Sequence, residues 1–455
     1  MQRTLTSGLI ATACAAALLL GAAPAGAAIS TVEMQGAPGP GPLEYNRVFV
    51  TKVGPPSADH VLVLIPGTIG GAGDFTQVAE DIVARVPNLQ VWAIDRRTQA
   101  FEDTSVFAQA LNGQATADQA FDYYLRWLID SSIQPHYQPL EPSSVPFVQQ
   151  WGLEVELNDV RQVVRAASKG GREVVLGGHS LGASSAAAYA TWDFNGRPGY
   201  RDVEGIVLID GGLLGTFDSF NAEQAQAELD KLPSQPFLDL LGLGLPWVAG
   251  IFAETGGLYA KLDPTGVSTA QQFPLLPPQF NPGFPVTNRA LLGYAFDEST
   301  SPAELALIHV RAGQLAASGD PRDWQDGEVT PIARLANTFA QEPANGIEWY
   351  FPYRLTIDVN GADRLKKNAV TRLLGLRTFH TAEVDTPLYA FQTSLTGGDV
   401  IRGAKRFVKR SEVRPGEAKL VDGSATTSHL DPLTAAPETN KFLDTVVPFL
   451  KDAFK

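Results

Sequence analysis

The stretch EVVLGGHSLGASSAAA, residues 173–188, decides the fold class. Its first half is a short apolar run of β character, and its second half is rich in alanine, a strong helix former. Between the two halves, Gly178, Ser180 and Gly182 form a G-x-S-x-G pattern. A serine at the tip of a sharp turn has a strained backbone, which only small neighbours two residues before and after it permit. The stretch therefore predicts a strand, a tight turn and a helix, with Ser180 exposed at the turn as a nucleophile.

The turn also places Ser180 at a helix N-terminus, where the Leu181 N–H and the helix dipole can face a developing oxyanion. The pattern alone arises by chance in loops, but its strand and helix flanks make chance the weaker interpretation. At this motif the chain resembles the α/β-hydrolase superfamily, from about residue 45 to the C-terminus apart from a central insertion. The resemblance implies an α/β fold with a mostly parallel central sheet flanked by helices.

The composition excludes some functions and indicates export. A formal charge of −14 over 455 residues argues against nucleic-acid binding, which requires a basic face. Residues 1–27 combine Arg3, an apolar run too short to span a bilayer and a small-residue exit, and they predict a signal peptide cleaved near Ala27. A membrane anchor or lipidation at Cys14, the only cysteine, is the disfavoured alternative. We expect a secreted, periplasmic or envelope protein without disulfides and without an integral membrane segment in its mature chain.

The pattern along the chain predicts two core segments, 45–213 and 386–455, after a flexible Gly/Pro-rich lead-in at 28–44. Apolar or alternating runs predict strands at residues 45–53, 60–65, 89–94, 173–178, 203–209, 386–392 and 418–421. Helical patterns occupy residues 75–86, 117–129, 154–168 and 439–453. This alternation of strands and helices is typical of an α/β protein.

Residues 214–385 are far too many for a simple crossover between strands, so they predict a large, mainly helical cap or lid. Helical stretches are expected near 302–317 and 330–341. The segment is strongly apolar in places and interrupted by Gly and Pro; part of it must pack on the sheet. The remainder would line an apolar pocket suited to an acyl or aromatic group. Residues 98–151 form a second long connection, which either walls the same site or is decoration.

A serine nucleophile needs a base, and His429 is the candidate among six histidines. It follows the last predicted strand and precedes the closing helix, which is the place of the base in the superfamily order of Ser, acid and His. His60 is expected at the opposite edge of the sheet, and His179 is beside the nucleophile but points elsewhere. His136 precedes the nucleophile in the chain, and His309 and His380 fall in the cap. These five histidines are therefore set aside.

The resemblance places the acid shortly after the strand at 386–392, and Asp399 is the predicted residue, orienting His429 and stabilising its charged form. The loop before Asp399 is longer than the common pattern. Asp210 is the alternative, because some superfamily members take the acid from the end of the earlier strand. Asp385 lies at the wrong end of its strand, and Asp431 is too close to His429 in sequence.

The glycine-rich loop at residues 66–74 follows the strand at 60–65. In the superfamily the corresponding loop supplies the second oxyanion N–H, often from an H-G-x sequence, but Pro66 stands where His is common. The resemblance assigns this role to the Thr68 N–H, with Ile69 as the neighbouring alternative and a plain connector as the other interpretation. Asp95 and Arg96 are expected to have structural roles in shaping this loop.

These residues predict a serine hydrolase that cleaves carboxylic esters of a small-molecule or lipid-like substrate, in the manner of esterases and lipases. An exported peptidase or amidase with the same triad is the alternative, and a non-catalytic binding protein on the same fold is a third. Dehalogenase chemistry is disfavoured because it needs Asp in place of Ser180. The chain lacks metal-ligand spacing, a P-loop and a Rossmann fingerprint, so no cofactor or metal is expected. The sequence makes no prediction of oligomeric state.

Overall fold

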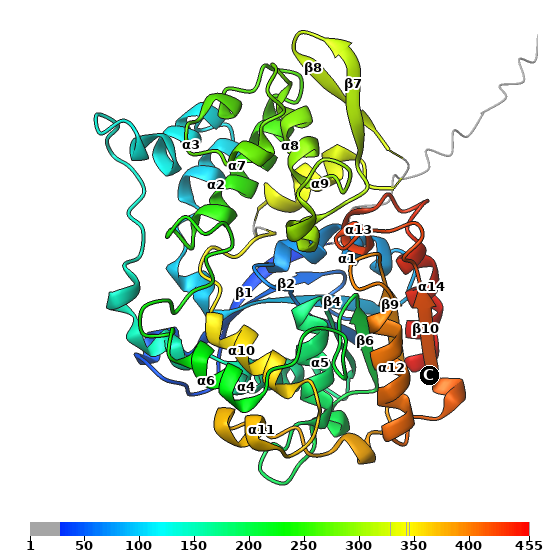
Figure 1. The fold of residues 1–455 in the computed structure, drawn as a ribbon. Coiled ribbons are helices and arrows are strands. Elements are labelled where there is room, and N and C mark those ends of the chain that lie inside the picture. Colours follow the sequence, from blue (N-terminus) through cyan, green and yellow to red (C-terminus); the bar gives the residue numbers. More distant parts are fainter. Residues whose placement is uncertain (1–27, 328, 343, 345, 455) are drawn as a thin grey trace, which may run out of the picture.

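The computed structural model describes residues 28–454 except 328, 343 and 345, so the predicted signal peptide lies outside the described residues. Its centre is an eight-stranded sheet in the order β1-β2-β4-β3-β5-β6-β9-β10 (Figure 1). The strands are β1 (Ile29–Gln35), β2 (Arg47–Val53), β3 (His60–Ile65), β4 (Leu89–Asp95), β5 (Glu173–His179), β6 (Gly205–Ile209), β9 (Leu388–Gln392) and β10 (Ala418–Asp422). β2 is antiparallel to both its neighbours, and all pairs from β4 to β10 are parallel. This topology is the α/β-hydrolase fold, as predicted.

Helices cover both faces of the sheet because the strand side chains alternate between two apolar cores. In β3, Val61 and Val63 belong to one core, and Leu62 and Leu64 to the other. The first core is completed by α4 (Leu153–Ala167), α5 (Leu181–Thr191) and α12 (Asp399–Arg410), and the second by α1 (Thr76–Val83) and α14 (Lys441–Ala453). The sheet is thus buried on both sides, which explains why its central strands are continuous apolar runs in the sequence.

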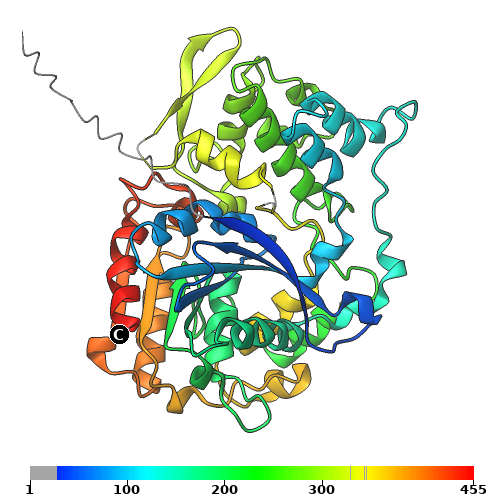
Figure 2. The same cartoon turned by 180° about the vertical axis from the view of Figure 1, so that it is seen from behind.

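A second lobe, the cap lobe, lies over one end of the sheet (Figures 1 and 2). It consists of α2 (Ser105–Leu111), α3 (Ala117–Tyr124), α7 (Val248–Leu262), α8 (Asn288–Phe296), α9 (Ile332–Phe339) and the hairpin of β7 (Gly313–Gly319) and β8 (Arg322–Asp326). Aromatic side chains join the two inserted segments: the ring centroids of Phe121 and Tyr259 are 6.1 Å apart, and those of Phe107 and Trp349 are 6.2 Å apart. The connection at 98–151 is therefore part of the lobe.

The segment 214–385, predicted as one cap, divides in the structure. Its helices α6 (Ala222–Leu229), α10 (Tyr353–Ala362) and α11 (Ala369–Leu374) lie beside α4 and α5, away from the cap lobe (Figure 1). Asp358 of α10 accepts a hydrogen bond from the Leu153 N–H at the start of α4, at 3.0 Å. These three helices therefore belong with the α/β core. The remaining helix, α13 (Asp431–Thr434), lies between β10 and α14 in the chain.

Two expectations about local structure were wrong. Residues 29–35 of the predicted flexible lead-in form β1, which pairs in full register with β2; an edge strand is ordered by backbone hydrogen bonds that its polar, half-exposed sequence does not reveal. The helix expected near 302–317 is a short 3₁₀ turn (Ala303–Ile308) followed by β7. Gly313 has φ 136°, a conformation that a helix does not contain, so the chain becomes extended there.

Candidate active site

The predicted turn at Ser180 is present between β5 and α5. Ser180 has φ 55° and ψ −123°, a strained conformation for a residue with a side chain, and its N–H donates to the Ile209 carbonyl of β6 at 2.8 Å. A Cβ added at Gly178 would collide with the Gly182 backbone, and one added at Gly182 would collide with the Ile65 carbonyl. The two glycines therefore allow the helix to start against the sheet, and they hold Ser180 at the tip of the turn.

His429 lies in the loop after β10, and the structure brings it to Asp210. Its Nδ1 lies 2.6 Å from Asp210 Oδ2, and both side chains are buried. Asp210 directly follows β6, the neighbour of β5, and it also accepts hydrogen bonds from the N–H (2.7 Å) and the hydroxyl of Thr393. Burial raises the pKa of the Asp210 carboxyl, but the contacts with His429 and Thr393 outweigh burial and lower its pKa below the ordinary value. Asp210 is thus held as a carboxylate beside His429.

The prediction of Asp399 as the partner of His429 was wrong. Asp399 is the first residue of α12, its side chain is 37% exposed, and it pairs with Arg402 at 2.5 Å. The loop after β9 turns at Gly397 and Gly398, both with positive φ, and leads into α12 instead of reaching the histidine. The residue next to β9 that does reach the site is Thr393, as a donor to Asp210. The alternative, Asp210, occupies the place expected of the acid.

The backbone of His429 is supported by two groups that the sequence did not assign. The His179 ring centroid lies 4.4 Å from that of His429, and His179 Nε2 lies 2.9 Å from the His429 carbonyl. Since a carbonyl only accepts, His179 Nε2 carries the hydrogen. Burial lowers the pKa of His179 to about 3, so its ring stays neutral. Asp431 accepts the Ser428 N–H at 2.6 Å and the Arg311 N–H at 3.0 Å, which holds the other side of the loop.

The positions of His60, His136 and His309 agree with the sequence analysis. His380 was expected in the cap, but its N–H donates to the Thr191 carbonyl at the end of α5 at 3.0 Å, so it lies in the α/β core. His60 contacts Glu173 at 3.0 Å at the amino end of the sheet, opposite the site. His380 pairs with Glu383, and His136 stacks on Trp127. The backbone of His309 links the cap lobe to the loop of His429, because its carbonyl accepts the Leu430 N–H at 3.0 Å.

The loop after β3 adjoins Ser180, as the predicted oxyanion role requires. A Cβ added at Gly67 would lie 3.0 Å from Ser180 Cβ, so the peptide that leads to Thr68 runs directly beside the nucleophile. Thr68 is half-buried, and Ile69 has φ 53°, a further strained residue at this edge. Both peptide N–H groups, of Thr68 and of Ile69, remain candidates for the second donor.

The expected structural roles of Asp95 and Arg96 are confirmed. Asp95 accepts the Ala72 N–H at 2.5 Å, and Arg96 Nη2 donates to the Pro66 carbonyl at 2.7 Å, so both ends of the glycine-rich loop are fixed. Arg96 is buried and pairs with Glu156 at 2.8 Å and with Glu348 at 2.9 Å. Because the Glu348 N–H donates to the Ile69 carbonyl at 2.7 Å, the same network connects the loop to the segment that enters from the cap lobe.

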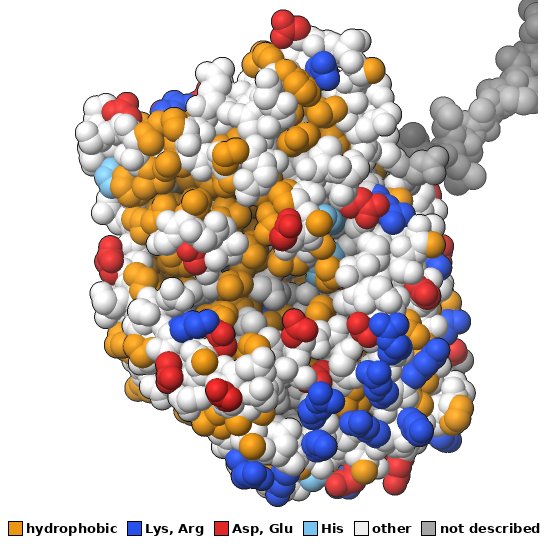
Figure 3. Space-filling model, in the orientation of Figure 1, with side chains coloured by type: hydrophobic (Ala, Val, Ile, Leu, Met, Phe, Trp, Pro, Cys, Tyr) orange, Lys and Arg blue, Asp and Glu red, His pale blue; other side chains and the backbone are white. Residues whose placement is uncertain are grey.

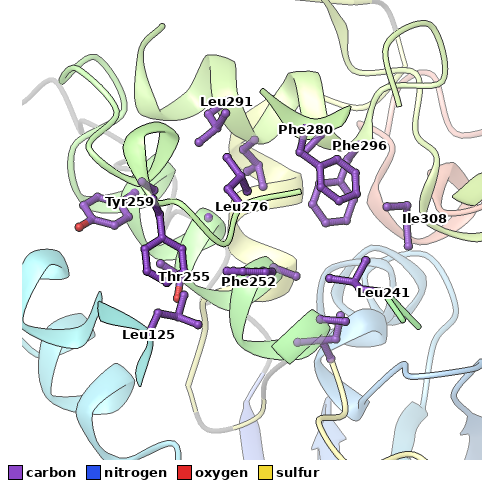
Figure 4. A pocket seen from close by; sticks show the side chains of 18 of the residues that line it. Leu125, Leu241, Phe252, Thr255, Tyr259, Leu276, Phe280, Leu291, Phe296 and Ile308 are labelled. Atoms are coloured by element: carbon purple, nitrogen blue, oxygen red, sulfur yellow. The ribbon is translucent and has the colours of Figure 1, made fainter. Parts of the chain in front are cut away.

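The cap lobe contains an apolar cavity of about 920 Å³, its open mouth included. Hydrophobic side chains gather on this side of the molecule over the cap lobe (Figure 3), and residues of α3, α7 and α8 form the cavity wall (Figure 4). Two wall residues connect the cavity to the site. Ile69 belongs to the loop beside Ser180, and Ile308 precedes His309, which is bonded to the loop of His429. The expectation of an apolar pocket in the inserted segments is therefore met, and the pocket shares Ile69 with the loop that adjoins Ser180.

Within residues 28–454, the described part of the chain, no group of three or more His, Cys, Asp or Glu side chains is arranged to hold a metal ion. None of the helices that the structure describes combines the length and apolarity needed to cross a bilayer.

Comparison with known proteins gives similarity in structure alone. No family model matches the sequence, and no curated protein does. Among solved structures, a candidate lipase from Sulfolobus solfataricus is 15% identical with a TM-score of 0.49, over 94% of this chain and 95% of the other. A monoacylglycerol lipase from Paleococcus ferrophilus is 10% identical (TM-score 0.42; 89% and 99%), and an epoxide hydrolase from Vigna radiata is 11% identical (TM-score 0.43; 93% and 98%). The strand order and the turn at Ser180 define the chain independently as an α/β-hydrolase-fold protein.

Proposed function

We propose that the protein is a serine hydrolase that cleaves carboxylic esters with an apolar acyl or aromatic portion, through an acyl-enzyme on Ser180. The observation that carries the proposal is the buried His429–Asp210 pair at the same sheet edge as the strained Ser180. A carboxylate that holds a histidine beside a serine at the tip of a strand-to-helix turn is the arrangement that activates a serine hydroxyl.

In the first step, His429 Nε2 takes the proton of the Ser180 hydroxyl as the oxygen attacks the ester carbonyl. Asp210 accepts from Nδ1–H, which fixes the tautomer with a free Nε2 and stabilises the imidazolium that forms. The tetrahedral intermediate then collapses as His429 returns the proton to the leaving alcohol. In the second step His429 activates water, which releases the carboxylic acid and restores Ser180.

The oxyanion of each tetrahedral intermediate is assigned to the N–H groups of Leu181 and Thr68. Leu181 is the first residue of α5, so the helix dipole adds to its N–H. Arg96 donates to the Pro66 carbonyl and holds the start of the Thr68 loop, and Gly67 lets the loop backbone pass close to Ser180. A rigid donor needs no reorganisation during the reaction, and removal of one such donor typically costs roughly 100- to 1000-fold in kcat.

The apolar cavity of the cap lobe supports the choice of substrate. Its apolar wall, which includes Ile69 of the loop beside Ser180 and Ile308 next to His309, suits the acyl or aromatic part of an ester. We also propose that the enzyme acts outside the cytoplasm, on the basis of the predicted signal peptide at residues 1–27.

The test is hydrolysis of p-nitrophenyl esters, from acetate to palmitate, by the mature protein and by Ser180→Ala. We expect activity in the wild type, a maximum at an intermediate or long acyl chain, and loss of activity in the variant. A matched control is Ser184→Ala, the next serine along the chain, whose hydroxyl donates to the Gly212 carbonyl.

Equal inactivity of wild type and Ser180→Ala on every ester would overturn the esterase proposal. Labelling of Ser180 by a phosphonate probe would then separate the remaining alternatives. A labelled but ester-inactive protein points to a peptidase or amidase, to be tested on peptide amides, whereas an unlabelled protein points to a binding function.

A further inference from the structure

Three side chains in the wall of the cap-lobe cavity carry buried polar atoms without a hydrogen-bond partner among the residues that the structure describes. They are Thr255 Oγ1, Ser268 Oγ and Asn288 Oδ1. The three residues are only 2%, 1% and 4% exposed. Buried polar atoms are nearly always paired because an unpaired one costs stability, so an exception needs an explanation, and three around one cavity indicate a ligand.

Ser268 and Asn288 lie on the same side of a short antiparallel pair of segments. Val267 pairs with Thr287, the Ser268 N–H donates to the Val286 carbonyl, and side chains alternate along such a pair. The two residues next to the Val267–Thr287 pair therefore project together, diagonally across from one another. Ser268 and Asn288 therefore belong to the same part of the cavity wall.

The hydrogen-bonding capacity of this pair selects a chemical group. Asn288 Nδ2 donates to the Asp263 carbonyl at 2.8 Å, which orients the amide and leaves Oδ1 as an acceptor. The Ser268 hydroxyl can donate or accept. A small neutral group that donates to Asn288 and accepts from Ser268, such as an alcohol hydroxyl, matches this capacity. A charged group is disfavoured, since the cavity wall, within the described chain, includes no charged side chain that could compensate its burial.

Helix α8 connects this pair to the segment that contains Ile308 and His309. Asn288 is its first residue and Phe296 its last, and the Phe296 carbonyl accepts the Val310 N–H beside Ile308 and His309. Nine residues of helix span roughly 12 Å. Asn288 thus lies about the length of this helix from Phe296, and the cavity wall between them is largely apolar (Figure 4).

We propose that the substrate of this enzyme is an ester whose apolar portion carries a neutral hydroxyl, remote from the scissile bond, which Ser268 and Asn288 bind. The inference rests on the proposed ester hydrolysis. Thr255 of the neighbouring helix α7 provides another hydroxyl in the apolar wall, among side chains such as Leu125 and Phe252 (Figure 4). The chain therefore selects hydroxylated over plain acyl groups of the same length.

The experiment compares kcat/KM for p-nitrophenyl decanoate and for its ω-hydroxy counterpart. In the wild type we expect a preference for the hydroxylated ester of about tenfold, the value of one or two net hydrogen bonds. In Ser268→Ala and in Asn288→Leu the preference should fall to about onefold, because the ratio of the two esters within one variant reports the loss of the hydroxyl contact. A melting curve of each variant checks that it is folded.

Ser301→Ala is the matched control. Ser301 is also buried in the segment between β6 and β9, and its Oγ also lacks a partner among the described residues, but it does not line the cavity. Its variant should retain the wild-type preference.

Equal kcat/KM for the two esters in the wild type, or a preference that survives in both Ser268→Ala and Asn288→Leu, would overturn the inference while leaving the esterase proposal intact. If neither ester is hydrolysed, the proposed function fails instead. Binding of decanol and of decane-1,10-diol, measured by calorimetry, then still tests the polar pair. Tighter binding of the diol by wild type than by Ser268→Ala supports it, and equal binding overturns it.

Discussion

The carboxyl edge of the sheet and the cavity of the cap lobe both contain buried polar groups, but the hydrogen bonding of these groups differs between the two regions. At the sheet edge, Asp210 is bonded to His429 and Thr393, and Arg96 is bonded to two carboxylates and to the Pro66 carbonyl. In the cavity, the polar atoms of Ser268 and Asn288 have no partner among the described residues. The polar groups of the first region are paired within the protein, whereas those of the second are the ones for which we propose a ligand.

This difference reflects the physical demands on each region. A catalytic group must already be in position when charge develops, so its partners are built into the fold. A binding wall gains selectivity from polar groups that only the right substrate completes, because the wrong substrate leaves them unpaired. Four predictions test the contrast between the two regions.

The largest effect is expected for the acid. Asp210→Asn should reduce kcat by about 10⁴-fold, because the amide no longer holds the productive tautomer of His429. Asp399→Asn should change kcat by less than about twofold, since Asp399 is half-exposed and pairs only with its own helix. Rates on one p-nitrophenyl ester decide between them. A larger loss in Asp399→Asn would show that the loop after β9 reaches the histidine in the working enzyme.

The buried network at the loop of Thr68 should dominate stability. Arg96→Met leaves Glu156 and Glu348 buried without their cation and should lower the free energy of unfolding by about 3–5 kcal/mol. The matched substitution Arg402→Met breaks the exposed pair with Asp399 and should cost less than about 1 kcal/mol. Urea denaturation measures both. Similar costs for the two variants would show that the Arg96 network does not hold the loop.

His179 predicts a pH dependence of stability. Its pKa is about 3 in the folded protein and near 6.5 in the unfolded chain, so between these values the unfolded chain binds a proton that the folded one does not. Stability is therefore lost as the pH falls below 6.5, by about 2 kcal/mol at pH 5 at the rate of ~1.36 kcal/mol per pH unit.

His179→Gln keeps an N–H donor for the His429 carbonyl but does not titrate. It should lose less stability than the wild type between pH 6.5 and 5, as measured by urea denaturation at each pH. Parallel losses in the two proteins would assign the pH dependence to other groups.

The smallest effect is expected in the cavity. A Cβ added at Gly256 of α7 would meet only Leu292 Cδ1, at 3.4 Å, so a larger side chain there extends into the cavity. Gly256→Leu should reduce kcat/KM for palmitate esters by about tenfold and leave acetate esters unchanged, since a short acyl group does not reach α7. Equal effects on both esters would mean that the acyl chain lies elsewhere.

The sequence by itself determined the local chemistry of the sheet edge. The spacing of Gly178, Ser180 and Gly182 predicts the turn because only glycine permits the close approach of helix and strand that the structure contains. The apolar runs predicted β3 and β5 because a strand buried on both faces has no polar positions. The position of His429 after the last predicted strand, together with the superfamily order of Ser, acid and His, made it the candidate base.

Only the tertiary structure decided the acid and the cavity. Asp210 and Asp399 both follow strands, and the choice between them depends on the path of the loop after β9, which sequence periodicity does not encode. The cavity is built by α3 from one insertion and by α7 and α8 from another, and its polar pair meets through segments about twenty residues apart. Local patterns are set by neighbours along the chain, whereas partners across an insertion are set by packing.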